Sequence, residues 1–268
     1  MTQLSGDAIN KGQFIPKIAL ERFQNSNVKE ATGTSRNSNT DEILSQTGKE
    51  CVSVRMQKLF LQHGKEHDFK RGRVFLLRGD AVHSVFAVVS GGIKIFRETH
   101  EGDESVLDLI TSGGMVPEVA LYDEGYIAPF NARVVSPSAK VIELPVSILR
   151  DKIKEEAEFA EDVCRMMVYR AHGLRLHAER LTVMNAAQKI TSFIMQHRPS
   201  GECAFRLPFD KALIARYLGM QPETFSRVQG ELAEAGIVIR GSIVTIADPS
   251  YVIEQMPTAF MDADEVLL

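Results

Sequence analysis

The hydrophobic and polar positions along the chain first separate an N-terminal stretch from the rest. Residues 1–50 carry few apolar side chains and are rich in Ser, Asn, Thr and Gly, as in "NSNVKEATGTSRNSNT". Such a segment buries too little apolar surface to offset the entropy lost on ordering, so we expect a flexible N-terminal extension. From residue 52 to 63 the spacing of apolar positions predicts a short amphipathic helix.

Short apolar runs then replace the helical pattern between residues 51 and 147. They read RVFLLRG, SVFAVVSGG, IKIFRETHEG and SVLDLITSGG, and each ends in glycine. Evenly spaced short strands with glycine turns predict a small antiparallel β-roll or barrel. We interpret the glycines as tight turns, because they permit backbone angles that a Cβ atom disfavours; a phosphate-binding cradle is the alternative. They are Gly79, Gly91, Gly92, Gly102, Gly113 and Gly114.

After Leu144 the period becomes helical and predicts a long helix over residues 148–184. Apolar and small side chains recur at alternating steps of three and four residues, the a/d spacing of a coiled coil. We expect this stripe to face a second copy of the chain in a homodimer; the alternative is that it packs on its own domain. The stripe consists of Cys164, Met167, Ala171, Leu174, Ala178, Leu181 and Asn185.

Residues 185–250 hold the most specific pattern. The run DKALIARYLG predicts a short helix that begins near Asp210 and is ended by Gly219. A second helix follows, with Gln221 at its cap and Pro222 at its first position. This arrangement has the spacing of a helix-turn-helix, and GIVIRGSIVTI after it predicts a hairpin wing. The apolar positions of the second helix are Phe225, Val228 and Leu232.

The opposite face of that second helix carries polar side chains suited to DNA. Arg227 can bond two acceptors of guanine, Glu223 can accept from cytosine, and Ser226 can contact a base or a phosphate. Thr224 and the N–H groups at the helix start can hold a phosphate. We predict that this helix reads the major groove; a solvated helix face is the alternative. The predicted DNA-contacting residues are Gln221, Pro222, Glu223, Thr224, Ser226 and Arg227.

Composition narrows the class of protein. A chain of 268 residues that is 44% hydrophobic can form two compact units, and its net charge of −4 confines any anion-binding surface to a local patch. We found no signal peptide and no apolar run of about 18 residues, so we expect a soluble, cytoplasmic protein with no membrane partner. Residues 251–268 form an acidic tail. No GxSxG, HExxH or GxxxxGK[ST] motif occurs, and we do not expect an enzyme.

The three cysteines lie far apart, at Cys51, Cys164 and Cys203, with no CxxC pair. This spacing disfavours a disulfide framework, a zinc site and an iron–sulfur cluster built within one chain.

The order of β-roll, long helix and winged helix-turn-helix, an α+β fold, resembles the Crp/Fnr superfamily of bacterial transcription regulators over roughly residues 52–248. The most specific part is GMQPETFSRV, in which Glu223, Ser226 and Arg227 match the Fnr-like pattern E-x-x-S-R. The resemblance implies an effector-sensing, cyclic-nucleotide-binding-like roll and a homodimer on palindromic double-stranded DNA with TTGAT-type half-sites. It also implies an activator that contacts RNA polymerase.

Within that superfamily, QPETFSR, NAAQKI and GECAFRLPFDKALIARYL look most like the Dnr branch, which responds to nitric oxide through haem. His172 matches a histidine of this branch and is the candidate haem iron ligand, although a second histidine of the branch is Gln188 here. A partly exposed helix histidine is the alternative for His172. Cyclic AMP is disfavoured: Glu118 is retained, but Ala128 and Pro129 stand where an arginine and a serine hold the cyclic phosphate.

The resemblance leaves other forms of control open. The cysteine-rich N-terminal motif of Fnr is absent, so an iron–sulfur cluster has no ligands. A redox role for Cys51 or Cys164 is an alternative to haem. The chain could also be a ligand-sensing module that acts on a protein partner, or a regulator without an effector that is controlled by its abundance.

Overall fold

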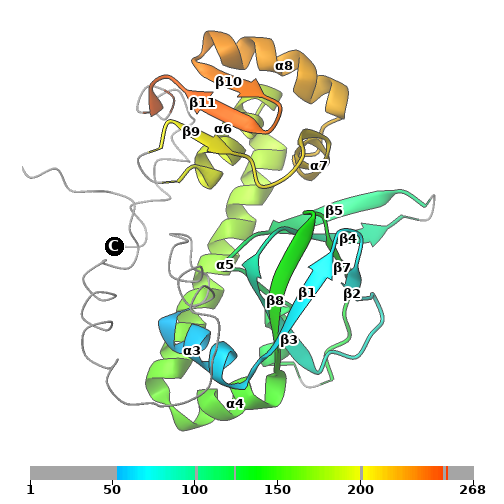
Figure 1. Cartoon of the computed structure of the whole chain (residues 1–268), viewed down its shortest axis with the longest axis vertical. Coiled ribbons are helices and arrows are strands. Elements are labelled where there is room, and N and C mark those ends of the chain that lie inside the picture. The colour runs from blue at the N-terminus through cyan, green and yellow to red at the C-terminus, as the bar shows by residue number, and fades with distance from the viewer. Residues whose placement is uncertain (1–52, 100–101, 124, 200–201, 250–251, 253–268) are drawn as a thin grey trace, which may run out of the picture.

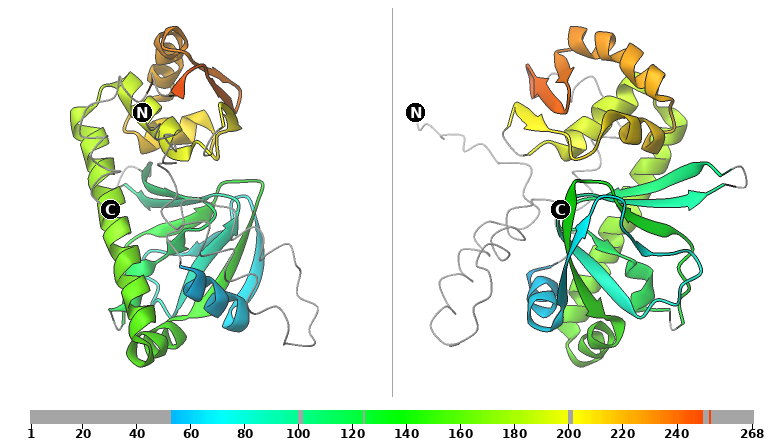
Figure 2. Two further views of the ribbon diagram at one scale, coloured as in Figure 1. Left: turned by 90° about the vertical axis from the view of Figure 1, so that its left-hand side faces the viewer. Right: turned by 45° about the vertical axis from the view of Figure 1, so that its right-hand side comes forward.

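A computed structural model describes residues 53–99, 102–123, 125–199, 202–249 and 252. The extension predicted for residues 1–50 and, apart from residue 252, the acidic tail lie outside these ranges. Two units follow one another along the chain: a β-roll, then a smaller unit of helices and a short sheet. The long helix α5 runs beside both of them (Figures 1 and 2).

The β-roll consists of two four-stranded antiparallel sheets, with strand orders β1-β8-β3-β6 and β2-β7-β4-β5. Side chains from both sheets, such as Val88 and Ile95, meet in one buried core. Residues of the neighbouring helices, such as Phe159, complete this core. The antiparallel roll predicted from the glycine-ended runs is confirmed. Its strands are β1 (Lys65–Lys70), β2 (Val74–Leu76), β3 (Ser84–Ser90), β4 (Ile93–Glu98), β5 (Glu104–Ile110), β6 (Met115–Val116), β7 (Asn131–Val134) and β8 (Ser138–Pro145), with a 3₁₀ helix η1 (Glu118–Leu121) after β6.

Two neighbouring glycines between β3 and β4 have different reasons to be glycine. Gly91 has φ +91°, and a Cβ atom added there would lie 2.5 Å from the carbonyl oxygen of Ser138, so both backbone angle and space require glycine. Gly92 lies outside the positive-φ region, and a Cβ atom added there would lie 2.7 Å from the ring of Phe209. Gly92 is therefore a contact point with the second unit.

The range predicted as one helix over 148–184 contains two helices. α4 spans Val146–Glu155 and α5 spans Ala157–Val183, and Glu156 between them is extended, with φ −125° and ψ 107°. The Glu156 N–H still bonds to the Lys152 carbonyl, which closes the last turn of α4. The long helix thus starts later than predicted.

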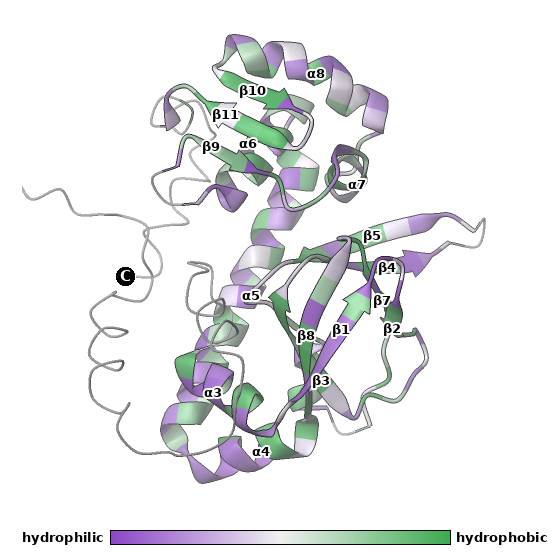
Figure 3. Cartoon of the chain, in the orientation of Figure 1, coloured by the Kyte–Doolittle hydropathy of each residue, from purple (hydrophilic) through white to green (hydrophobic). Residues whose placement is uncertain are grey.

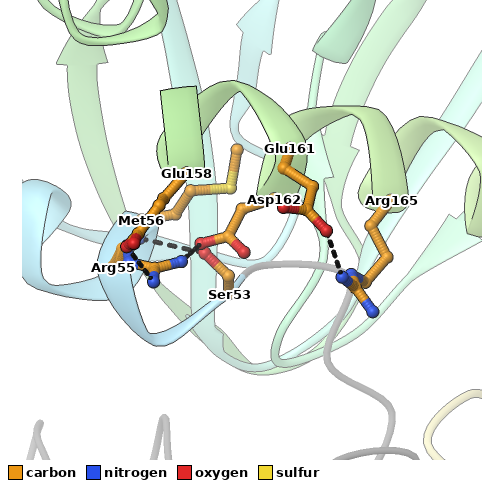
Figure 4. Close-up of polar contacts among 7 residues, drawn as sticks. All are labelled: Ser53, Arg55, Met56, Glu158, Glu161, Asp162 and Arg165. Carbon is orange, nitrogen blue, oxygen red and sulfur yellow. Dashed lines mark hydrogen bonds and ion pairs between the residues drawn. The ribbon is translucent and has the colours of Figure 1, made fainter. Parts of the chain in front are cut away.

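The amphipathic helix expected near residues 52–63 is α3 (Val54–His63), which Ser53 caps by accepting from the Met56 N–H. α3 is tied to the first turns of α5 by Arg55, whose guanidinium lies 2.6 Å from Glu158 and 3.0 Å from Asp162 (Figure 4). These exposed pairs contribute little stability, about 0.2–1 kcal/mol each. Their consequence is mainly geometric, since they fix where α3 lies along α5.

The second unit begins with α6 (Ala186–His197), which has a complete capping box. Asn185 accepts from the Gln188 N–H at 2.9 Å, and the Gln188 side chain accepts from the Asn185 N–H at 3.1 Å. Asn185 therefore caps α6, and its prediction as the last position of the coiled-coil stripe is wrong. The remaining elements are β9 (Ala204–Arg206), α7 (Lys211–Tyr217), α8 (Pro222–Glu234), β10 (Ile237–Arg240) and β11 (Ile243–Ile246), with sheet order β10-β11-β9.

Candidate nucleic-acid interface

The turn between α7 and α8 follows local chemistry that is visible in the sequence. Asp210 caps α7 by accepting from the Leu213 N–H at 2.8 Å. Gly219 ends the helix with φ +66°, a value that glycine adopts without strain. Gln221 is the cap of α8 and Pro222 its first residue, where a missing N–H leaves no helical bond unmade. The predicted helix-turn-helix is confirmed.

The inner face of α8 determines which side chains point outward. Phe225, Val228 and Leu232 are at most 4% exposed and pack in one core with residues of α6, α7 and the wing. Full burial of each such side chain contributes about 1.5–3 kcal/mol, so α8 is held in one rotation about its axis. Of the polar residues between these three positions, Ser226, Arg227 and Glu231 therefore face solvent, whereas Gln229 is partly buried.

Three of the predicted DNA-contacting residues form an exposed stripe on α8: Glu223, Ser226 and Arg227. No ion pair found among the described residues uses Glu223 or Arg227, so these side chains can bond a ligand without losing a protein partner. The Ser226 hydroxyl donates to the Pro222 carbonyl at 3.1 Å, a bond that a hydroxyl exchanges at little cost. Gln221 is also exposed at the cap, whereas Pro222 and Thr224 are partly covered.

The second unit carries further arginines outside this stripe; sequence reasoning placed Arg240 at the turn of the wing but did not single out Arg206 or Arg216. Arg216 is exposed in the last turn of α7, and Arg240 is exposed where the wing turns. Arg206 of β9 donates to the Ser242 hydroxyl at 2.8 Å, beside the same turn. Arginines at such positions can contact phosphates without reading bases. In the sequence, only their position close to the predicted helix-turn-helix could have indicated that these arginines can contact DNA.

The predicted dimer stripe lies on the outside of α5. Leu174 is 53% exposed and Leu181 is 40% exposed, and Ala171 and Ala178 are exposed as well. Met167 differs, because it packs partly on the roll core. The alternative, in which the stripe is covered by its own chain, applies to Met167 and in part to Leu181, whose side chain lies close to Gly219. It does not apply to Ala171, Leu174 and Ala178.

Glu118, the residue that the resemblance retains from the cyclic-nucleotide site, already has a protein partner in this structure. Arg170 of α5 donates to Glu118 at 2.6 Å and also bonds Asp108 of β5. Ala128 is buried, and the Pro129 carbonyl accepts from Arg97 at 2.6 Å. Burial alone would lower the pKa of Arg170, but Asp108 and Glu118 outweigh it and raise that pKa, so the guanidinium stays charged.

The surroundings of His172 do not fit iron ligation through Nε2. Its Nδ1 lies 3.3 Å from Nη2 of Arg175, and a guanidinium can only donate, so Nδ1 is the acceptor and Nε2 carries the proton. An imidazole that binds iron through Nε2 needs the opposite tautomer. Nε2 is buried with no hydrogen-bond partner. The described residues also contain no group of three or more His, Cys, Asp or Glu side chains placed to hold a metal ion.

Comparison with known proteins matches both units to families. Residues 66–156 match the cyclic nucleotide-binding domain, and residues 188–252 match the Crp-like helix-turn-helix domain. The chain is 26% identical over 197 residues to the anaerobic regulatory protein of Haemophilus influenzae, covering 71% of this chain and 76% of that one. It is 25% identical over 197 residues to the fumarate and nitrate reduction regulatory protein of Vibrio cholerae, covering 71% and 78%.

Among solved structures, FixK2 from Bradyrhizobium japonicum shares the fold. Its TM-score is 0.64 at 16% identity, and the match covers 72% of this chain and 98% of that one. The relatives named above are regulatory proteins, which confirms the expectation that the chain is not an enzyme. Within the described part of the chain, every helix is too short or too polar to cross a membrane.

Proposed function

We propose that this chain, a member of the Crp/Fnr family of DNA-binding transcription regulators, binds a two-fold symmetric DNA site as a homodimer. The exposed stripe of Glu223, Ser226 and Arg227 on α8 is the observation that carries the proposal. Its three side chains supply donors and acceptors to base edges, while the buried face of the same helix holds them in place. The half-site we propose is of the TTGAT kind.

The outward face of α5 supports the dimeric part of the proposal. Leu174 and Leu181 leave much of their surface uncovered, with the small Ala178 between them and Ala171 before Leu174, and two identical helices could approach closely there. A dimer with a two-fold axis presents two recognition helices to half-sites one helical turn apart, which is why a palindrome is expected.

Arg227→Ala tests the reading of DNA. In a gel-shift titration with a TTGAT palindrome, loss of a bidentate bond to guanine should cost roughly 1–3 kcal/mol of discrimination at one base pair of each half-site. Arg240→Ala on the wing is the matched control, because a phosphate contact there should weaken specific and random duplexes about equally. An equal loss on both duplexes after Arg227→Ala would show that Arg227 does not read a base.

Control by haem and nitric oxide stays a prediction that rests on the family resemblance. Titration of the purified protein with hemin tests it: a bound haem should shift the Soret band, and His172→Ala should abolish that shift if His172 is the ligand. Unchanged spectra in both proteins would leave a redox role for Cys51 or Cys164, or regulation by abundance. The partnered Glu118 and the buried Ala128 support the proposal that cyclic AMP is not the effector.

Activation through RNA polymerase is likewise proposed from the resemblance. Transcription from a promoter with the palindrome, reconstituted with purified polymerase, should rise on addition of the protein. If the chain acted on a protein partner and not on DNA, the exposed Glu223 and Arg227 would have no role in DNA binding. Neither Arg227→Ala nor Arg240→Ala would then alter the affinity for DNA.

A further inference from the structure

The helix-turn-helix unit rests on the β-roll through a small apolar contact that we call the interdomain seat. α7 lies against β5, at the end of the roll that faces the second unit (Figures 1 and 2). The ring of Phe209 covers Gly92 so closely that no Cβ atom would fit between them. The seat consists of Gly92, Val106, Leu109 and Val135 of the roll and Phe209 and Tyr217 of the second unit.

The seat also touches the long helix. The Tyr217 ring stacks on His177 of α5, with centroids 4.2 Å apart and the planes 10° from parallel. Tyr217 packs in addition against Phe193 of α6 at a centroid distance of 6.0 Å. Besides its neighbour α8, α7 therefore contacts three elements that hold its orientation: β5, α5 and α6.

Arg170 connects this seat to the rest of the roll. Its guanidinium bonds Asp108 of β5 and Glu118 of η1, and the Asp108 and Glu118 side chains are only 13% and 15% exposed. Asp108 also accepts from the N–H of Leu109, which belongs to the seat. Without the guanidinium, two poorly solvated carboxylates would lie close together and repel each other. β5 would then have to shift at the residue beside the seat.

We propose that Arg170 is a positioning residue for DNA binding: by holding Asp108 of β5 it fixes the interdomain seat, and with it the orientation of the helix-turn-helix unit relative to α5. This inference rests on the proposed function, because its consequence appears only on a two-part DNA site. One recognition helix needs no partner to bind one half-site. Two helices bind a palindrome tightly only if both are held at the spacing of the half-sites, since that sets their effective concentration.

The test compares Arg170→Gln with Arg165→Gln in the full chain by fluorescence anisotropy. Arg165 lies on the same helix, is exposed and, among the residues that the structure describes, pairs with Glu161 alone, one turn away. We expect Arg170→Gln to bind the palindrome about tenfold more weakly and a single half-site unchanged, through loss of effective concentration. Arg165→Gln should bind both as the wild type does. Tighter palindrome binding, no change, or an equal loss on both duplexes after Arg170→Gln would overturn the inference.

A second variant reaches the seat without touching Arg170. Gly92→Leu should push Phe209 off the roll, because even a Cβ atom there would lie 2.7 Å from its ring, and the backbone at Gly92 accepts a side chain. It should reproduce the selective loss on the palindrome. If Arg170→Gln does not fold, Gly92→Leu provides the test instead. A Gly92→Leu protein that binds the palindrome as tightly as the wild type does would refute the role of the seat.

Hydrogen exchange separates failure of this inference from failure of the proposed function. If the wild type binds a palindrome no better than a half-site, the proposed function is wrong. The amides of β5 and α7 should still exchange faster in Arg170→Gln than in Arg165→Gln, because the seat is loosened whether or not DNA is present. Equal exchange in these two elements would overturn the positioning role of Arg170.

Discussion

Leu174→Glu should convert the dimer into monomers without unfolding the chain. Leu174 is 53% exposed within one chain, so the substitution disturbs little of the monomer core. Full burial of a leucine contributes about 1.5–3 kcal/mol, and roughly half of this side chain is left for a partner to cover, or about 1 kcal/mol per chain. Two facing carboxylates about 4 Å apart add about 1 kcal/mol of repulsion even at the dielectric constant of water.

The total of roughly 3 kcal/mol corresponds to about a hundredfold weaker dimer, measurable by sedimentation equilibrium over a range of concentrations. Val183→Glu is the matched control, because Val183 is 73% exposed and lies on the opposite side of α5. It should leave the dimer unchanged. A Leu174→Glu protein with a native circular dichroism spectrum and the dissociation constant of the wild type would show that this face does not form the dimer.

Three further changes test the packing around the helix-turn-helix. Phe225→Ala should lower the free energy of unfolding by about 3–5 kcal/mol in urea titrations, because Phe225 is 1% exposed; a loss near zero would contradict its place in the core. Asn185→Ala removes the capping box of α6 and should cost about 1 kcal/mol in the same assay. Burial and the charge of Arg180 lower the pKa of His177, although Asp108 opposes them. The folded state thus binds fewer protons than the unfolded one, and stability should fall as the pH drops below about 6.5. His177→Phe keeps the stacked ring and should remove this part of the pH dependence of thermal melting; an unchanged dependence would refute it.

The helix-turn-helix could be predicted from the sequence because its determinants are local. Gly219 and Pro222 mark the turn, and the apolar positions of α8 recur with the helical period, so each residue's role depends on neighbours a few positions away. The glycine-ended runs located β2 to β5 for the same reason. The outward direction of Glu223 and Arg227 then followed from the buried face.

Parts of the roll carry no such local signal. β1 reads KEHDFK, drawn mostly as hydrophilic in Figure 3, and it lies at the edge of its sheet, where polar side chains are tolerated. It is recognisable as a strand only through its pairing with β8. The interruption of the long helix at Glu156 was missed as well, because glutamate is a good helix former and the helical spacing continues past it.

The seat could not be predicted, because its partners are distant in sequence. Arg170 lies 62 positions from Asp108 and 52 from Glu118, and no periodicity relates them. The closeness of Phe209 to Gly92 likewise depends on how the two units are stacked. Contacts between two units can therefore be identified only from the folded structure of both.

The joint between α5 and α6 consists of Met184 and Asn185 alone, both extended, with Met184 buried and the capping box closing the start of α6. A helix whose first donors are already satisfied does not easily unwind to absorb a change in the linker. One inserted residue would lengthen this joint by about 3.3 Å and turn the side chains that follow to the opposite side. Among descendants of a common ancestor, the number of residues here should therefore vary less than their identity, and insertions should accumulate in surface loops instead.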